Sequence, residues 1–192
     1  MIALFTDFGL EGPYTGQVNA VLHQAAPGVP IISLFADLPA GQPKPAAYLL
    51  AAYAVWFPAR TVFLCIVDPG VGSARRAVVA EAAGRFYVGP DNGLFEIVLR
   101  RAAPASLWKI TWRPPALSAS FHGRDLFAPV AARLAQGEPP SAMASPAAAA
   151  PHPDWPDDLA EIVYIDRYGN ALTGLRGDRV SASARLAAGA TA

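Results

Sequence analysis

Polar side chains that can bind or activate a small molecule stand directly after three apolar runs of this sequence. Each cluster alone is explained by a turn, because Asp, Asn, Pro and Gly are ordinary turn residues. Three clusters at one sheet edge instead favour a shared polar pocket, since open α/β sheets bind ligands at the carboxyl ends of their strands. The clusters are Asp7 after Ile2 to Phe5, Asp68 after Thr61 to Val67, and Asp91-Asn92 after Phe86 to Gly89.

His122 is a further candidate, within Phe121-His122-Gly123-Arg124-Asp125. Asp125 is placed to cap the helix that follows, or to favour its dipole, which leaves His122 without a structural explanation. A lone histidine is nevertheless more often structural than catalytic. The sequence has neither a Gly-x-Ser-x-Gly elbow nor a His-Glu-x-x-His motif, so it does not support a serine hydrolase or a zincin. It also lacks a close carboxylate pair at metal spacing, so we expect no metal site.

The elements that must position these residues alternate between apolar runs and helical segments. Short uninterrupted apolar runs are typical of strands covered on both faces. The alternation predicts an α/β domain with a mostly parallel sheet flanked by helices. The predicted strands are Ile2 to Phe5, Ile31 to Phe35, Thr61 to Val67, Ala77 to Ala80 and Phe86 to Gly89, and the helices are Tyr14 to Ala26, Pro45 to Phe57, Leu94 to Arg101 and Leu126 to Gln136.

Composition limits the possible partners. The chain has 192 residues, 53% of them hydrophobic, and fifteen basic residues balance fifteen acidic ones. The absence of net charge gives no field to attract nucleic acid or an anionic membrane surface. The single cysteine, Cys65, lies in an apolar run and is expected to be a buried structural thiol. The N-terminus lacks the features of a signal peptide and no apolar stretch is long enough to span a bilayer, so a cytoplasmic location is expected.

The texture of the sequence changes after residue 138. The segment 139–156 is rich in proline and alanine and is interpreted as a linker between an N-terminal domain, 1–138, and a second unit, 157–192. In the second unit, Glu161 to Ile165 is a predicted strand, followed by a turn at Asp166 to Asn170 and a second strand. We interpret it as the start of an incomplete C-terminal β domain.

Five motifs, in order, resemble the S-adenosyl-L-methionine hydroxide adenosyltransferase family, whose relatives include fluorinating and chlorinating enzymes. No single motif would suffice, but together they cover the chain from residue 1 to about 173. They are Thr6-Asp7-Phe8-Gly9, Val67-Asp68-Pro69-Gly70-Val71-Gly72, Gly89-Pro90-Asp91-Asn92-Gly93-Leu94, Phe121-His122-Gly123-Arg124-Asp125-Leu126-Phe127-Ala128-Pro129 and Ile165-Asp166-Arg167-Tyr168-Gly169-Asn170.

The resemblance implies an α/β domain, a C-terminal β-barrel that is truncated here, and a homotrimer when that domain is complete. It implies no cofactor, because S-adenosyl-L-methionine is the substrate. The substrate would lie between the α/β domain of one subunit and the barrel of its neighbour. The resemblance implies that the attacking water is positioned and activated by Asp68, Arg75 and His122. The implied substrate contacts are Asp7 to the ribose, Asp166 to the methionine ammonium group, Asn170 to the adenine, and Asn92 in the same pocket.

The implied reaction suits these residue types. A sulfonium departs as a neutral thioether, so the reaction needs a placed and activated water but no acid or metal. Either His122 or Asp68 is a candidate to accept the proton of that water, with Arg75 holding the developing hydroxide. Two alternatives remain: a halogenase, disfavoured because Asp68, Arg75 and His122 are all present, and a catalytically impaired nucleoside-binding protein, suggested by the short β domain.

Overall fold

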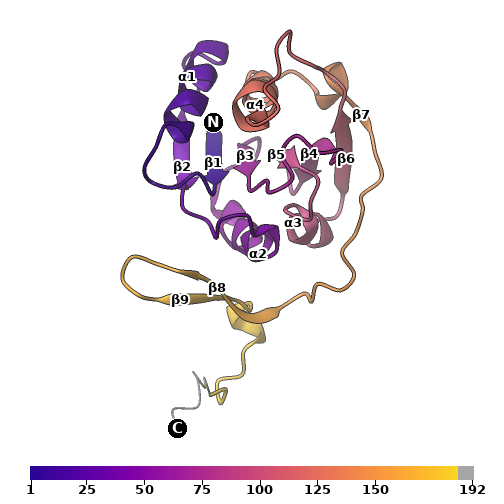
Figure 1. Cartoon of the computed structure of the whole chain (residues 1–192). Helices are drawn as coiled ribbons and strands as arrows, with labels where there is room; N and C mark the ends of the chain where they lie inside the picture. Colours follow the sequence, from indigo (N-terminus) through magenta and orange to yellow (C-terminus); the bar gives the residue numbers. More distant parts are fainter. Residues whose placement is uncertain (186–192) are drawn as a thin grey trace.

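The computed structural model describes residues 1–185, which form a three-layered α/β unit followed by a two-stranded hairpin (Figure 1). The strands are β1 (Ile2–Thr6), β2 (Ile31–Phe35), β3 (Val62–Ile66), β4 (Ala77–Ala82), β5 (Arg85–Pro90), β6 (Ala105–Ile110), β7 (Ala144–Pro146), β8 (Leu159–Ile165) and β9 (Ala171–Gly174). The helices are α1 (Tyr14–Ala25), α2 (Pro43–Tyr53), α3 (Glu96–Arg100) and α4 (Ala128–Ala135). Single turns of 3-10 or π helix are η1 (Ala54–Trp56), η2 (Gly123–Phe127), η3 (Pro140–Ala142) and η4 (Gly177–Arg179).

The main sheet has seven strands in the order β2-β1-β3-β5-β4-β6-β7. The strands β2, β1, β3 and β5 are parallel, whereas β5, β4, β6 and β7 pair antiparallel. The tight turn at Ala83 and Gly84 reverses the chain between β4 and β5, so these two strands pair antiparallel. The predicted α/β class is confirmed, and the sheet is mixed rather than mostly parallel.

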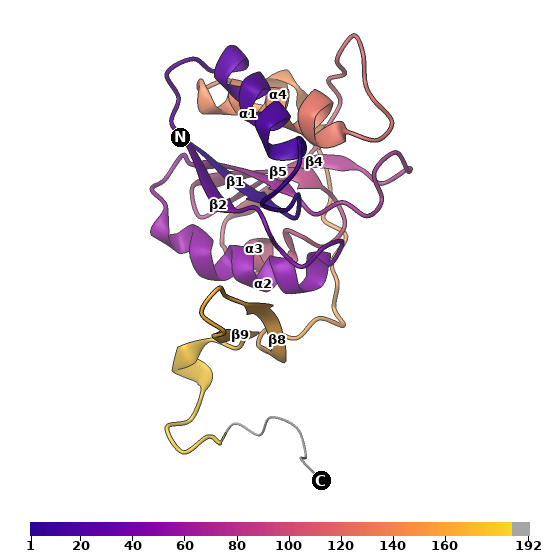
Figure 2. The same ribbon diagram turned by 60° about the vertical axis from the view of Figure 1, so that its left-hand side comes forward.

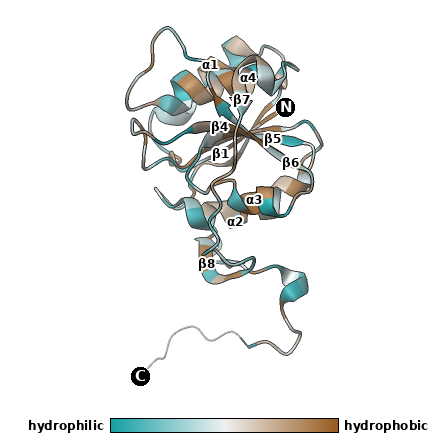
Figure 3. Cartoon of the chain, turned by 90° about the vertical axis from the view of Figure 1, so that its right-hand side faces the viewer, coloured by the Kyte–Doolittle hydropathy of each residue, from teal (hydrophilic) through white to brown (hydrophobic). Residues whose placement is uncertain are grey.

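Helices cover both faces of this sheet (Figure 2): α1 and α4 lie on one face, α2 and α3 on the other. Alternate residues of a strand point to opposite faces, so Ala3 and Phe5 of β1 join the cluster under α2 while Ile2 and Leu4 join the cluster under α1. Hydrophobic residues accordingly concentrate in the strands and on parts of the helices beside them (Figure 3). Cys65 is fully buried, as expected from its apolar run.

The segment 139–156 was expected to be a linker without regular structure, and its first half contradicts that expectation. Met143 and Ala144 are buried, and β7 pairs with β6 at the sheet edge. The sequence pattern hides this strand because it is only three residues long and ends in Pro146, which an edge strand tolerates. The proposed boundary at residue 138 therefore falls before the last strand of the sheet.

The hairpin of β8 and β9 packs beneath α2 (Figures 1 and 2). Leu159 and Val163 are buried in the cluster that also contains α2. The hydroxyl of Tyr164 donates to Oδ2 of Asp37 over 2.9 Å, and Lys44 pairs with Glu161 at 3.5 Å. These two strands are the only ones after β7 within residues 1–185, and they form no closed barrel there. Residues 186–192, the end of the predicted second unit, lie outside the described residues.

None of the helices in the described part of the chain combines the length and hydrophobicity needed to cross a membrane.

Candidate active site

Asp68 and Arg75 form a buried ion pair beyond the carboxyl end of β3. Nε of Arg75 donates to Oδ1 of Asp68 at 2.8 Å and to Oδ2 at 3.1 Å, and Nη2 also contacts Oδ2. The side chains are only 10% and 6% exposed, so solvent screens this pair weakly. The guanidinium also lies over the ring of Phe127, 5.2 Å from its centroid. These contacts fix the Arg75 side chain in one orientation.

The guanidinium of Arg75 also contacts His122, through the same Nη2 atom that contacts Asp68. Nη2 of Arg75 lies 2.9 Å from Nδ1 of His122, which immediately precedes η2. Arginine is always protonated and can only donate, so Nδ1 must be the acceptor in this contact. A neutral His122 therefore carries its hydrogen on Nε2. Burial lowers the pKa of His122, and the charge of Arg75 lowers it further, so the neutral form is favoured.

Asp7, Asp68 and His122 line one cavity of about 150 Å³. Asp7 follows β1, which lies next to β3, and its Oδ2 accepts a hydrogen bond of 2.8 Å from the backbone N–H of Gly41. Burial raises the pKa of Asp7, and this hydrogen bond partly offsets the rise. Asp7 and Asp68, which the sequence predicts to share a pocket, line this cavity together with His122. Asp91, expected in the same pocket, does not line it and pairs with Arg76 instead.

Aromatic rings form one side of the same cavity. Phe8 and Phe121 line it and meet edge to face at 5.9 Å, and Tyr14 contacts both rings. These residues and Gly41 were not among the predicted site residues. The available signal was position: Phe8 and Phe121 adjoin Asp7 and His122, and Gly41 stands just before the proline-started helix α2. Apolar rings beside carboxylates suit a ligand with a flat apolar part and a cationic part.

Asn92 has a different place from the one expected. Its Nδ2 donates to the carbonyl of Val67 at 2.9 Å, and its Oδ1 accepts from the backbone N–H of Leu94 at 3.3 Å. The amide therefore braces the end of β3 just before Asp68, and Asn92 is not among the residues that line the cavity. Its position supports a structural role in holding Asp68.

Asp166 and Asn170 lie in the turn of the β8–β9 hairpin and do not line the cavity within residues 1–185. Asp166 accepts hydrogen bonds from the backbone N–H groups of Tyr168 and Asn170 and from Nδ2 of Asn170. The bond from Asn170 is the main reason that the pKa of Asp166 is lowered. Asn170 is exposed and Asp166 is partly exposed, so both retain hydrogen-bonding capacity toward solvent.

Asp125 makes no capping hydrogen bond, but it lies in the first turn of η2, where a negative charge favours the helix dipole, which was the second alternative expected from the sequence. It accepts hydrogen bonds from the backbone N–H of Ser118 at 3.0 Å and from the neighbouring Arg124 side chain. The carboxylate is drawn to these donors because η2 continues directly into α4, which leaves no free helix start at Asp125. Asp125 thus fastens the loop that leads to His122.

A glycine locks the two loops of the site together. Gly72 has a φ of +79°, and a Cβ atom placed there would lie 2.6 Å from the carbonyl oxygen of Ala119. Gly72 belongs to the loop between Asp68 and Arg75, and Ala119 to the loop before His122. Only glycine permits this approach, which holds Arg75 and His122 in register.

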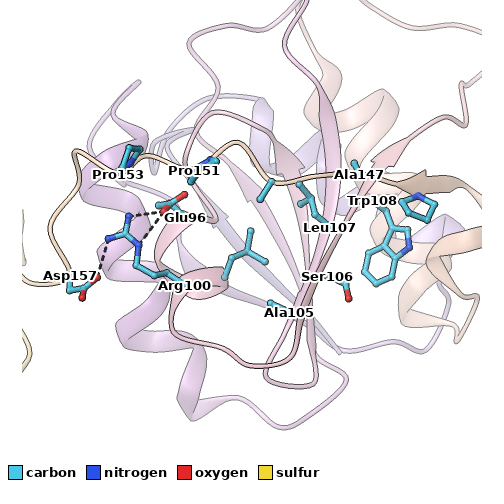
Figure 4. A pocket seen from close by; sticks show the side chains of 13 residues that line it. Glu96, Arg100, Ala105, Ser106, Leu107, Trp108, Ala147, Pro151, Pro153 and Asp157 are labelled. Carbon is cyan, nitrogen blue, oxygen red and sulfur yellow. Dashed lines mark hydrogen bonds and ion pairs between the residues drawn. The ribbon is translucent and has the colours of Figure 1, made fainter.

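A larger cavity, of about 940 Å³, lies elsewhere, between α3, β6 and the chain after β7 (Figure 4). Its lining is mostly apolar, and its main charged groups pair with each other, Arg100 with Glu96 and Asp157. It contains none of the residues predicted to do chemistry. The smaller cavity at Asp7, Asp68 and His122 is therefore the candidate active site. Residues 1–185 contain no group of three or more His, Cys, Asp or Glu side chains arranged to hold a metal ion.

Comparison with known proteins identifies the family of this chain. Residues 2–144 match the SAM hydroxide adenosyltransferase N-terminal domain. The chain belongs to this family. A (R)-S-adenosyl-L-methionine hydrolase of Thermus thermophilus is 40% identical over 192 residues, which cover 91% of this chain and 74% of the relative. A protein of the same name from Salinispora arenicola is 35% identical over 202 residues, covering 97% and 77%.

Solved structures agree with this membership in the SAM hydroxide adenosyltransferase family. An uncharacterized conserved protein from Thermotoga maritima superposes with a TM-score of 0.84 and is 32% identical, covering 90% of this chain and 71% of that one. A conserved hypothetical protein from Thermus thermophilus gives a TM-score of 0.71 at 37% identity, covering 91% and 72%. The fold is therefore that of other proteins with related sequences.

Proposed function

We propose that this protein hydrolyses S-adenosyl-L-methionine to adenosine and L-methionine. The observation that carries the proposal is the linked set Asp68, Arg75 and His122 at the wall of a cavity that also contains Asp7. Relatives at 35–40% identity over most of the chain are named (R)-S-adenosyl-L-methionine hydrolases, which supports the same reaction here. Two carboxylates in the cavity favour a substrate that carries a positive sulfonium.

Hydrolysis at C5′ requires a water molecule in line with the departing sulfur. The oxygen of water forms a bond to C5′, the C5′–S bond breaks, and methionine leaves as a neutral thioether. The proton of the water must go to a base of the protein. Placement of the water accelerates such a step by removing the cost of bringing the reactants together.

We divide these tasks among three residues. Because Nδ1 of His122 accepts from Arg75, the N–H at Nε2 is the group that can hold the attacking oxygen. Asp68 lines the same cavity and is the remaining candidate base, with carboxylate lone pairs beyond those used by Arg75. Arg75 stabilises negative charge as it develops. Of the two bases considered from sequence, we therefore assign the proton to Asp68.

Substrate contacts outside this cavity belong to the proposal. Asp7 would hold the ribose hydroxyls, and Asp166 and Asn170 would reach the methionine and adenine parts. Since the hairpin turn lies apart from the cavity in one chain, these two residues would come from a neighbouring subunit of a trimer. We further propose that the enzyme is cytoplasmic, needs no cofactor and has no nucleic-acid or membrane partner.

Reaction in ¹⁸O-labelled water tests the proposed activity. We expect equal amounts of adenosine and L-methionine, with the label at the 5′ oxygen of adenosine. A 5′-halo-5′-deoxyadenosine formed in high chloride or fluoride would assign the protein to the halogenating relatives. Substrate binding without any turnover would instead indicate a nucleoside-binding protein.

Activity should also survive a chelator, because a sulfonium leaves without help from a Lewis acid. The measurement is turnover before and after treatment with EDTA, followed by gel filtration. Loss of activity that returns with added Mg²⁺ would contradict the assignment of a cofactor-free reaction.

A further inference from the structure

A second cavity lies on the other side of His122. It has a volume of about 240 Å³ and shares His122 with the candidate active site. Its lining includes four cationic side chains, from Arg75, Arg76, Lys109 and Arg113, and no carboxylate. Asp68 and Asp91 neutralise two of these cations, Arg75 and Arg76. The cavity therefore holds two uncompensated positive charges when His122 is neutral.

The two uncompensated cations come from separate segments. Lys109 lies on β6 and is exposed, and its side chain has no hydrogen-bond or ion-pair partner among residues 1–185. Arg113 follows β6, and its Nη1 donates only to the carbonyls of Ile110 and Trp112. Both residues are exposed at the mouth of the cavity, whereas Arg75 and His122 are more buried. Convergent cations that have no acidic partner form a ready site for an anion.

The cationic sulfonium of the proposed substrate gains nothing from positive charge at this place. The carboxylates of Asp7 and Asp68 face the first cavity, and the cations of Lys109 and Arg113 face the second. His122 lines both cavities, so the negative charges of the first and the positive charges of the second both act on it. A charge that enters the second cavity must therefore change the proton affinity of His122.

We propose that this second cavity binds a small oxyanion of the inorganic phosphate class, held by Lys109 and Arg113 in contact with His122 and Arg75. The bound oxyanion would attract a proton to His122. Protonation at Nδ1 removes the acceptor that Arg75 now uses, so the Arg75–His122 contact would break. Phosphate would thereby inhibit the reaction from outside the substrate cavity, and by linkage a low pH would strengthen its binding.

The test follows His122 directly and does not depend on turnover. The chain has three histidines, so the Cε1–Hε1 signal of His122 can be assigned by its loss in His122→Asn. Its pKa is measured by NMR in chloride and in phosphate at equal ionic strength. The charges acting on His122 in both media are those of Arg75, Asp68, Arg113 and Asp125. We expect phosphate to raise the pKa of His122 by at least about half a unit, a threefold gain in proton affinity.

Two variants assign the effect to this cavity. Lys109→Gln should reduce the phosphate-induced rise, and Lys109→Gln combined with Arg113→Gln should abolish it. Arg60→Gln is the matched control, because Arg60 precedes β3 and thus lies at the end of that strand opposite to Asp68; it should leave the rise intact. Since Lys109 has no side-chain hydrogen bond among the described residues, its single variant remains informative if the double variant fails to fold.

Equal pKa values of His122 in phosphate and in chloride would overturn the proposal. They would show that phosphate acts on His122 only by general screening, which is the same in both media. So would a phosphate-induced rise that persists in the folded double variant. An enzyme without S-adenosyl-L-methionine turnover would still give the expected titration, which separates this proposal from the proposed function.

Discussion

Arg75 donates to Nδ1 of His122 over 2.9 Å, and this single contact determines which ring nitrogen of His122 is free to act. The same guanidinium holds Asp68. The three side chains thus behave as one unit, in which a change at Arg75 alters both neighbours. The predictions below use this relationship.

Replacement of His122 should distinguish a donor from a base. If Nε2–H only holds the attacking oxygen, His122→Gln places an amide N–H near the same position and should retain turnover within about tenfold of the native enzyme. His122→Ala should lose about 10²-fold or more, because no donor remains. The measurement is kcat and KM for all variants. Equal and complete loss in both variants would restore His122 as the proton acceptor.

The pH dependence of His122 follows from its lowered pKa. Burial and the charge of Arg75 lower the pKa of His122 from its ordinary value of 6.5, so the neutral ring is the more populated form at pH 6.5. Turnover should persist below pH 6.5 and fall as the ring becomes protonated. The unfolded chain binds this proton more readily, so stability should decrease as pH falls from 6.5 toward the folded-state pKa, and this contribution then levels off.

Arg75→Gln provides the control for the pH prediction. Removal of the cation, with Asp68 left beside the ring, should raise the pKa of His122, which NMR titration can measure. An unchanged pKa would show that Arg75 does not set the charge of this histidine.

Gly72→Ala should separate the two loops that carry Arg75 and His122. The new Cβ would meet the carbonyl oxygen of Ala119 at 2.6 Å while the backbone keeps a φ of +79°. We expect a loss of stability of roughly 1–3 kcal/mol from strain, and a fall in turnover beyond what stability explains. Gly28→Ala is the matched control, because Gly28 has a φ of +80° and no atom within 4 Å of the added Cβ. Similar turnover in both variants would show that the loop contact is dispensable.

Subunit mixing tests the proposed composite site. Asp68→Ala and Asp166→Ala should each inactivate a site, yet in a mixed trimer some sites would pair an intact Asp68 with an intact Asp166 of the neighbour. Partial activity should therefore return when the two inactive variants are unfolded and refolded together. Activity that stays absent in a mixture shown to be trimeric would place both residues in the same chain's site.

Leu159→Ala should loosen the hairpin without unfolding the sheet. Leu159 is 3% exposed against the α2 side of the core, and a Leu-to-Ala change at such a site costs about 2–5 kcal/mol. The control is Ile162→Ala, since Ile162 is 61% exposed. Hydrogen exchange should increase across β8 and β9 in the first variant only. Unchanged exchange would mean that other contacts, such as Tyr164 with Asp37, hold the hairpin.

The sequence predicted the elements whose patterns are local and missed those that depend on pairing. The strands β1 and β3 are apolar runs whose residues are all buried, so their composition identifies them, and β2 is an apolar run of the same length at the edge of the sheet. By contrast, β6 carries exposed residues, and β7 is visible only through its pairing with β6.

The candidate site likewise combines residues that local sequence predicts with contacts that only tertiary packing creates. The positions after β1 and β3 identified Asp7 and Asp68, because strand ends are where a parallel sheet gathers its ligands. The tautomer of His122 and the bracing role of Asn92 depend on distances between segments far apart in the chain. Such distances are set by tertiary packing, and no spacing in the sequence encodes them.

The β8–β9 ribbon also affects how the protein must be handled. Among residues 1–185 the outer edge of each strand has no neighbouring strand, and Ile162, Ile165 and Tyr168 of the ribbon are largely solvent-exposed. Open strand edges beside exposed apolar side chains are templates for edge-to-edge aggregation. Light scattering should therefore rise with protein concentration and storage time. A charged substitution such as Ile165→Lys should improve solubility, because a lysine on an edge strand opposes such growth.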